Sequence, residues 1–221
     1  STPPPVNPHG LDYGDAFPQL AVINVPEVHD IWIDGTDITV GMLDNGYRWR
    51  THEALESRNV LGEYDFINKD SVVSNEPGDP SNQDGHGTAT FSTMAGFTES
   101  QLVGPVYNAA FYLAKTEVNG SETQVEEDYW VQGIEWLEGL GVDVVSSSLG
   151  YDIFDDGTGY TFENEDFDGQ TAVTTRAAAR AAWLGVVVVN SAGNEERSGG
   201  VGQNLIAPAD ADSIITVGAV N

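Results

Sequence analysis

Residues 38–44 read ITVGMLD, a largely apolar run that ends in a carboxylate. Four similar runs follow it, namely AAFYLAK (109–115), VDVVSSSLG (142–150), VVVVN (186–190) and IITVGAV (214–220). Strands that are covered on both faces of a parallel sheet are apolar along most of their length, whereas strands with one wet face alternate. The five runs therefore predict a parallel sheet that is covered on both faces.

Helix-like stretches separate these runs. Residues 121–141 begin with Ser121 and Gln124 at the spacing of a capping box and end on a glycine. Residues 169–185 are rich in alanine and also end on a glycine, and a shorter helix is expected over residues 86–95. Strands that alternate with helices predict an α/β fold, a doubly wound and mainly parallel sheet with helices on both faces.

The N-terminus differs from the rest of the chain. Residues 1–10 read STPPPVNPHG, which is rich in proline and has no periodicity. We expect residues 1–18 to be an extended arm or a processing remnant, and residues 19–221 to form one domain, because no linker-like break interrupts them. Two acidic stretches, 65–84 and 151–168, are expected as loops at the surface.

The composition excludes several classes of partner. The chain has 35 acidic and 8 basic residues and a net charge of −27, which repels nucleic acid and anionic membrane surfaces. No apolar run approaches the roughly 20 residues that cross a bilayer. The absence of cysteine excludes disulfides and thiolate zinc sites. The acidic surface suits high salt or cation binding, and an acidic secreted protein without a special salt requirement is an equal alternative.

Polar residues follow several of the predicted strands. Ligands bind at the carboxyl ends of the strands in an open α/β sheet, so residues 44–46, 146–150 and 191–194 are expected at one edge. His86 lies between two glycines in DGHGTAT. A histidine beside a buried aspartate is a general base, and an asparagine at the same edge can stabilise an oxyanion by about 3–4 kcal/mol.

Each of these residues also has a simpler interpretation. Asp44 alone fits a turn or a cap, and Asn194 fits a turn that needs a left-handed backbone. His86 alone fits a structural histidine, or a metal ligand together with Asp84. The serines of residues 146–148 fit small residues that pack under a loop. The order of the motifs along the chain decides between these interpretations.

Four segments, VGMLDNG, DGHGTAT, VVSSSLGY and VVNSAGNE, occur in this order. From about Gln19 to the end, the chain resembles the subtilisin-like serine proteases, secreted enzymes that cut peptide bonds. The resemblance implies that Asp44 orients the imidazole, that His86 is the general base and that Asn194 donates to the oxyanion. It also implies a substrate-binding edge at Ser148, Leu149 and Gly150, with Ala192 and Gly193 opposite.

The nucleophile of the family is missing from these motifs. It follows a glycine-threonine pair beyond the segment that corresponds to residues 217–220, and the chain contains neither Gly-Thr-Ser nor G-x-S-x-G. We therefore expect a fold that is incomplete at the C-terminus, with the serine on a second polypeptide or a missing segment. The isolated chain is expected to be inactive and poorly folded, because strand 186–189 loses its cover.

Two classes of function fit these observations. The first is a serine endopeptidase that needs no cofactor for its chemistry and acts on a peptide or protein substrate. The second is a non-catalytic protease-like module that binds peptides, or an inactive truncated fragment. A nucleotide-binding enzyme is disfavoured, because the chain has no G-x-G-x-x-G or Walker lysine motif.

A calcium loop is the weaker of two interpretations for residues 164–169, NEDFDG. Asn164, Asp166 and Asp168 have the ligand spacing of such a loop, but the twelfth position is Thr175 instead of glutamate. A surface loop is the stronger interpretation, and structural calcium is retained as an alternative.

Overall fold

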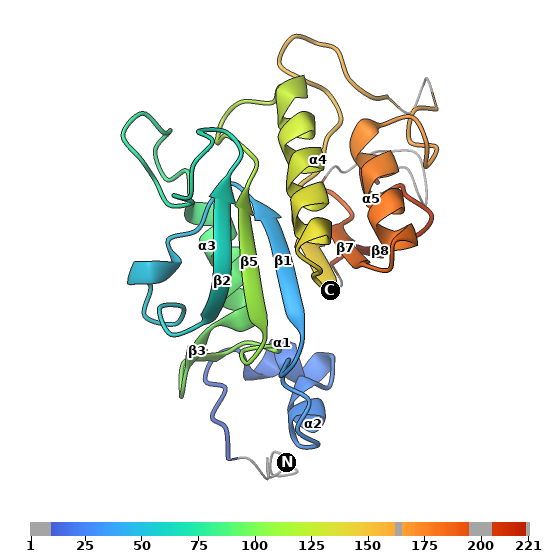
Figure 1. The fold of residues 1–221 in the computed structure, drawn as a ribbon. Coiled ribbons are helices and arrows are strands. Elements are labelled where there is room, and N and C mark those ends of the chain that lie inside the picture. Colours follow the sequence, from blue (N-terminus) through green and yellow to red (C-terminus); the bar gives the residue numbers. More distant parts are fainter. Residues whose placement is uncertain (1–9, 162–164, 195–204, 220–221) are drawn as a thin grey trace.

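A six-stranded sheet forms the centre of the molecule, which was studied as a computed structural model that describes residues 10–161, 165–194 and 205–219. The strand order is β2-β5-β1-β6-β7-β8, and every neighbouring pair is parallel. The strands are β1 Thr39–Asp44, β2 Asn59–Asp65, β5 Ala110–Lys115, β6 Val144–Ser147, β7 Val187–Ser191 and β8 Ile215–Val217. The predicted parallel sheet is confirmed (Figure 1).

Helices cover both faces of the sheet. Helix α3, Gly85–Ala95, lies on one face, and α4, Gln124–Gly139, and α5, Val173–Trp183, lie on the other (Figure 1). The core on the α3 side includes Phe91 and Phe111, and the core on the α4 side includes Trp130 and Val145. The doubly wound α/β fold predicted from the sequence is therefore confirmed.

The N-terminus of α4 is capped by residues other than the predicted pair. Thr123 and Glu126, not Ser121 and Gln124, form the capping box. The Glu126 carboxylate accepts the backbone N–H of Thr123 at 2.6 Å and that of Val118 at 2.9 Å. One glutamate at this position therefore satisfies two backbone donors, which glutamine at position 124 does not do.

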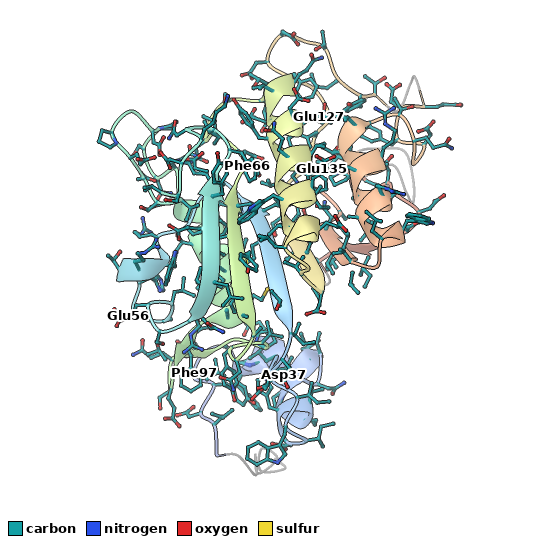
Figure 2. The ribbon with its side chains drawn as sticks, viewed as in Figure 1. Asp37, Glu56, Phe66, Phe97, Glu127 and Glu135 are labelled. Carbon is teal, nitrogen blue, oxygen red and sulfur yellow. The ribbon has the colours of Figure 1, made fainter. Side chains whose placement is uncertain are left out.

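On the same helix, Glu127 lies on the side that faces α5 and accepts the Thr174 hydroxyl (Figure 2).

Several short elements were not predicted from the sequence. Strand β2 lies at the edge of the sheet, and its register shifts between Val60 and Gly62. A glycine and polar residues in a strand weaken the apolar pattern that reveals buried strands. The other unpredicted elements are α1 Phe17–Val22, α2 Val25–His29, the 3-10 turn η1 Trp49–Thr51, and the antiparallel pair of β3 Phe97–Thr98 and β4 Leu102–Val103.

Packed structure begins before Gln19. Tyr13 is buried, its ring stacks on His29 at a centroid distance of 5.7 Å, and its hydroxyl forms a 2.7 Å hydrogen bond with Nδ1 of that histidine. Nε2 of His29 lies 2.9 Å from the carbonyl oxygen of Pro105. Residues 10–18 of the expected arm therefore pack against the domain, while residues 1–9 lie outside the described residues.

One part of the sheet lacks cover on the α3 side. Val188 is buried in the core under α5, whereas Val187 next to it is 46% exposed. Side chains two apart in a strand share a face, so Val189 faces the same side as Val187, and Val217 faces the same side as Ile215. Val189 is in register with Ile215, so Val187, Ile215 and Val217 all lie on the α3 side. Ile215 and Val217 are 53% and 51% exposed. An apolar strip at β7 and β8 therefore faces solvent.

Candidate active site

Asp44 and His86 meet at the carboxyl end of the sheet. Asp44 is the last residue of β1 and is buried, and His86 is the second residue of α3. Nδ1 of the imidazole lies 2.6 Å from Oδ1 of Asp44. Forty-two positions separate the two residues in sequence, so the fold brings this predicted pair together.

Both oxygens of the Asp44 carboxylate have additional donors. The backbone N–H of Asn45 donates to Oδ1 at 2.8 Å, and the hydroxyl of Thr90 donates to Oδ2 at 2.9 Å. Thr90 lies one helical turn after His86, a spacing that places both side chains on one face of α3. Sequence reasoning assigned Thr90 no role, although the four-residue spacing from His86 is a signal that could have revealed it.

The Asp44 carboxylate controls the charge of His86. The hydrogen bond that Asp44 accepts from the imidazole and the negative charge of Asp44 raise the pKa of His86 above its usual value, against the opposing effect of partial burial. Because Asp44 engages Nδ1, Nε2 is the nitrogen that can take a proton from another group. The His86 side chain is 51% exposed, which leaves this half of the imidazole accessible. The pair has the geometry of an oriented general base.

A cavity of about 310 Å³ opens beside His86. The predicted residues Ser148, Leu149, Gly150, Gly193 and Asn194 line it together with His86, and the remaining lining residues are Asn45, Glu117, Asn119, Glu122, Ser191 and Ile206. Asp44 and Ala192 are not among the lining residues. The fold thus gathers six of the eight predicted site residues around one cavity.

Backbone pairing fixes two walls of this cavity. Tyr151 and Ala207 exchange backbone hydrogen bonds of 2.8 and 3.2 Å, and the N–H of Ile206 donates to the carbonyl oxygen of Ala192 at 3.3 Å. Nδ2 of Asn190, which is buried, donates to the carbonyl oxygen of Leu149 at 3.0 Å. Ala192 therefore does not line the cavity, but its backbone carbonyl oxygen holds Ile206, which does. Sequence reasoning missed Ile206, which belongs to none of the four motifs.

The close approach of α3 to β1 requires a glycine at position 87. A Cβ atom on Gly87 would overlap the carbonyl oxygen of Gly46 and lie 2.9 Å from Cβ of Asp44. We expect Gly87→Ala to lower the free energy of unfolding by about 1–3 kcal/mol, because α3 has to move away from β1. The same shift separates His86 from Asp44, so the pKa of His86 is expected to fall.

Urea unfolding and an NMR titration of the imidazole of His86 measure both effects. Gly139→Ala is the matched control, because a Cβ on Gly139 has no atom within 4 Å outside its own helix. It is expected to leave the stability unchanged or to raise it by up to about 1 kcal/mol. Equal stability of the two variants would contradict the packing argument.

The calcium candidates from the sequence have other roles where they are described. Oδ1 of Asp168 accepts the backbone N–H groups of Gln170 and Thr171, and Asp166 pairs with Thr161, while Asn164 lies outside the described residues. A different group, Asp65, Asp70 and Glu76, has carboxylate oxygens within 4.8 Å of one another. These residues belong to the acidic loop that was expected at residues 65–84.

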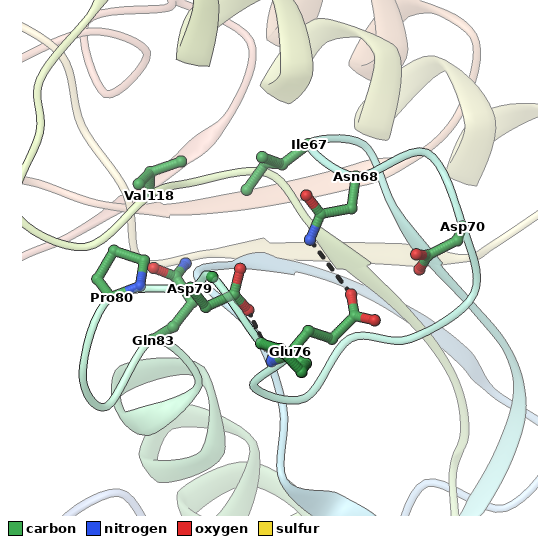
Figure 3. A pocket seen from close by; sticks show the side chains of 10 residues that line it. Ile67, Asn68, Asp70, Glu76, Asp79, Pro80, Gln83 and Val118 are labelled. Atoms are coloured by element: carbon green, nitrogen blue, oxygen red, sulfur yellow. Dashed lines mark hydrogen bonds between the residues drawn. The ribbon is translucent and has the colours of Figure 1, made fainter.

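Hydrogen bonds hold the acidic loop around a second pocket, of about 370 Å³. The Nδ2 group of Asn68 donates to Glu76 at 3.2 Å, and the backbone N–H of Glu76 donates to Asp79 at 3.0 Å (Figure 3). Lys115 is fully buried and reaches Oδ2 of Asp65 and Oδ2 of Asp79, both at 2.8 Å. A buried lysine therefore already compensates part of the negative charge of this loop.

Known proteins resemble this chain over most of its length. The profile of the Subtilase family matches residues 35–221. Subtilisin DY of Bacillus licheniformis is 32% identical over 205 residues, which are 91% of this chain and 63% of that protein. Subtilisin E of Bacillus subtilis (strain 168) is 30% identical over 214 residues, which are 95% of this chain and 48% of that protein. The chain thus spans between about half and just under two thirds of the length of these curated relatives.

A solved structure supports the fold. The CspB protease of Clostridium perfringens superposes with a TM-score of 0.57 and covers 77% of this chain, which covers 39% of that protein. The two sequences are 22% identical, so this likeness concerns the fold alone.

Proposed function

The chain belongs to the subtilase family, and on that premise we propose that it supplies the base, the oxyanion donor and the substrate-binding edge of a serine endopeptidase. The observation that carries this proposal is the 2.6 Å contact between His86 and the buried Asp44 at the mouth of a cavity. The residues of the four motifs that line this cavity support the proposal.

The proposed reaction uses these residues in order. Nε2 of His86 takes the proton of a serine hydroxyl while the serine oxygen bonds to the carbonyl carbon of the peptide. The carbonyl oxygen becomes an oxyanion, and the side-chain amide of Asn194 donates to it. His86 then gives the proton to the leaving nitrogen as the C–N bond breaks. Water releases the acyl group by the same steps, and Asp44 stabilises the imidazolium each time it forms.

Labelling with a serine-directed phosphonate tests this proposal on the full gene product. We expect one equivalent of label, detected by intact mass, together with cleavage of a denatured protein substrate. His86→Ala is expected to abolish both results, because the base is missing. A full gene product that takes no label and cleaves nothing would overturn the proposal.

A non-catalytic peptide-binding module is the second candidate. The cavity beside residues 148–150 favours it as well, because an extended peptide can pair with a strand-like edge without being cut. Peptide binding by the full gene product without phosphonate labelling would support this candidate. Peptide binding by an inactive fragment would support it as well. Phosphonate labelling therefore distinguishes the two proposals, because only the endopeptidase is expected to take the label.

We further propose that a serine-bearing polypeptide covers the apolar strip at Val187, Ile215 and Val217. Each large apolar side chain left exposed forgoes about 1.5–3 kcal/mol of stability. The isolated 221 residues are therefore expected to unfold without cooperativity on heating and to aggregate, whereas the full gene product unfolds cooperatively. Differential scanning calorimetry compares them, and a monomeric, cooperatively unfolding isolated chain would contradict this proposal.

Among the described residues, no helix has both the length and the apolar character needed to cross a membrane. We propose that the protein is secreted, as the resemblance to subtilisins implies. The proposed reaction requires no cofactor. We propose calcium only in a structural role and not in the reaction.

A further inference from the structure

Glu117 places an unusual carboxylate in the wall of the cavity. It lies two residues beyond the end of β5 and lines the cavity together with His86. Its Oε2 atom is buried and has no hydrogen-bond partner. A buried carboxylate oxygen without a donor costs free energy, so such an atom in a binding site calls for an explanation.

The backbone of Glu117 is held firmly in place. The N–H of Thr116 donates to the carbonyl oxygen of Asp44 at 3.0 Å. The side-chain amide of the buried Gln83 donates to the carbonyl oxygens of Asn45 and Glu117, at 2.7 and 2.5 Å. Oε1 of Gln83 accepts the N–H of Asn119 at 2.8 Å. Glu117 is thus tied to the strand end that carries Asp44.

The surroundings of Glu117 are negatively charged. Burial, followed by the charges of Glu122, Glu126 and Asp44, raises the pKa of Glu117 well above its usual value. Of these neighbours, Glu122 also lines the cavity. Among the described residues, no lysine or arginine lines the cavity, and Lys115 is already engaged by Asp65 and Asp79.

Glu126 shows what a carboxylate with only a structural role looks like in this region. Its oxygens accept the N–H groups of Val118 and Thr123 and the Thr123 hydroxyl. Glu117 differs, because one of its oxygens is withdrawn from solvent and still lacks a donor. The missing donor is therefore expected to come from a molecule that enters the cavity.

We propose that Glu117 determines specificity by binding the lysine or arginine side chain of a peptide in the cavity. A cation beside Glu117 favours the charged form of this carboxyl, which its raised pKa otherwise disfavours, and it supplies the N–H donor that Oε2 lacks. The charge of Glu122, which also lines the cavity, favours the cation further. A charge-assisted hydrogen bond in a partly buried site is expected to favour such a peptide by about tenfold or more. This inference rests on the proposed function for the location of the peptide, but it concerns recognition and not the chemical step.

Binding of fluorescent hexapeptides to the full gene product carrying His86→Ala, which is expected not to cleave them, tests the inference apart from the chemical step. In each pair of peptides, one lysine in an alanine background is compared with norleucine, which has a similar length and no charge, at each position in turn. We expect lysine to bind at least about tenfold more tightly than norleucine at one position. Glu117→Gln is expected to remove this preference and to leave norleucine binding within about twofold.

Glu135→Gln is the matched control, because it makes the same change on an exposed part of α4 and is expected to keep the preference. Equal binding of lysine and norleucine at every position would overturn the inference, as would a preference that survives Glu117→Gln. Calcium binding that depends on Glu117, without a lysine preference, would also overturn it. A lysine preference together with a wild-type gene product that cleaves nothing would support the inference and count against the endopeptidase alone.

Discussion

Replacement of Asp44 by asparagine is expected to lower kcat/KM of the full gene product on a peptide substrate by about 10⁴-fold. Asparagine nearly preserves the shape of the side chain but removes the charge that stabilises the imidazolium. It also replaces one acceptor oxygen with an NH₂ group, although both oxygens of Asp44 now accept hydrogen bonds, from Asn45, His86 and Thr90. At least one of these contacts therefore has to rearrange.

The pKa of His86 gives a second measure of the same change. The hydrogen bond that the Asp44 carboxylate accepts raises this pKa above its usual value, so the asparagine variant is expected to titrate at lower pH in an NMR experiment. A raised folded-state pKa stabilises the fold below the unfolded pKa and loses this effect as pH rises through the folded value. The stability difference between wild type and variant is therefore expected to be larger near pH 5 than near pH 9.

Asp37→Asn is the matched control for Asp44→Asn. Asp37 is exposed, precedes the amino end of β1, and has a left-handed backbone that asparagine tolerates (Figure 2). Its replacement is expected to leave kcat/KM and the pKa of His86 unchanged. If Asp44→Asn also kept full activity, the assignment of Asp44 as the orienting carboxylate would be wrong.

Replacement of Lys115 by methionine is expected to lower the free energy of unfolding by about 3–5 kcal/mol. The ammonium group is fully buried between Asp65, which is also fully buried, and Asp79. Methionine retains much of the apolar stem but leaves two carboxylates without their cation. Urea unfolding of the full gene product at neutral pH measures the loss.

The pH dependence of this loss follows from Asp79. Burial alone raises the pKa of Asp79, but the hydrogen bond from Lys115 and other donors outweigh burial, and the net shift is downward. A lowered pKa stabilises the fold above the unfolded value of 3.8, and this contribution is lost as pH falls through the folded value. The defect of Lys115→Met is therefore expected to shrink as the pH falls below 3.8 toward the folded-state pKa of Asp79, where this carboxylate takes up a proton.

The chain has one other lysine, and it provides the control. Lys69 is exposed in the same acidic loop. Lys69→Met therefore makes the same chemical change without leaving a buried carboxylate unpaired. Its effect is expected to stay within about 0.5 kcal/mol. Equal losses for the two variants would show that total charge, and not the buried ion pairs, accounts for the effect.

The sheet and the central pair of the site could be predicted from the sequence because their signals are local. Both faces of the central strands are covered, so the apolar runs that form β1 and β5 are nearly continuous. Asp44 and His86 lie in short motifs whose order indicates the family. Edge strand β2 and the cap of α4 gave weaker signals, because a glycine interrupts the first and several polar residues compete at the second.

Only the tertiary structure placed Lys115 between two aspartates and left Glu117 with an unpaired oxygen. Lys115 is 36 positions from Asp79, and the cavity around Glu117 is built from residues as distant as Ile206. In the sequence, each of the two is a single charged residue after an apolar run. The sequence by itself determined five of the six strands, the order of the motifs and the position of Asp44 and His86 at one edge of the sheet. Burial, which depends on distant parts of the chain, decided that Lys115 is compensated by two carboxylates and that Oε2 of Glu117 has no donor.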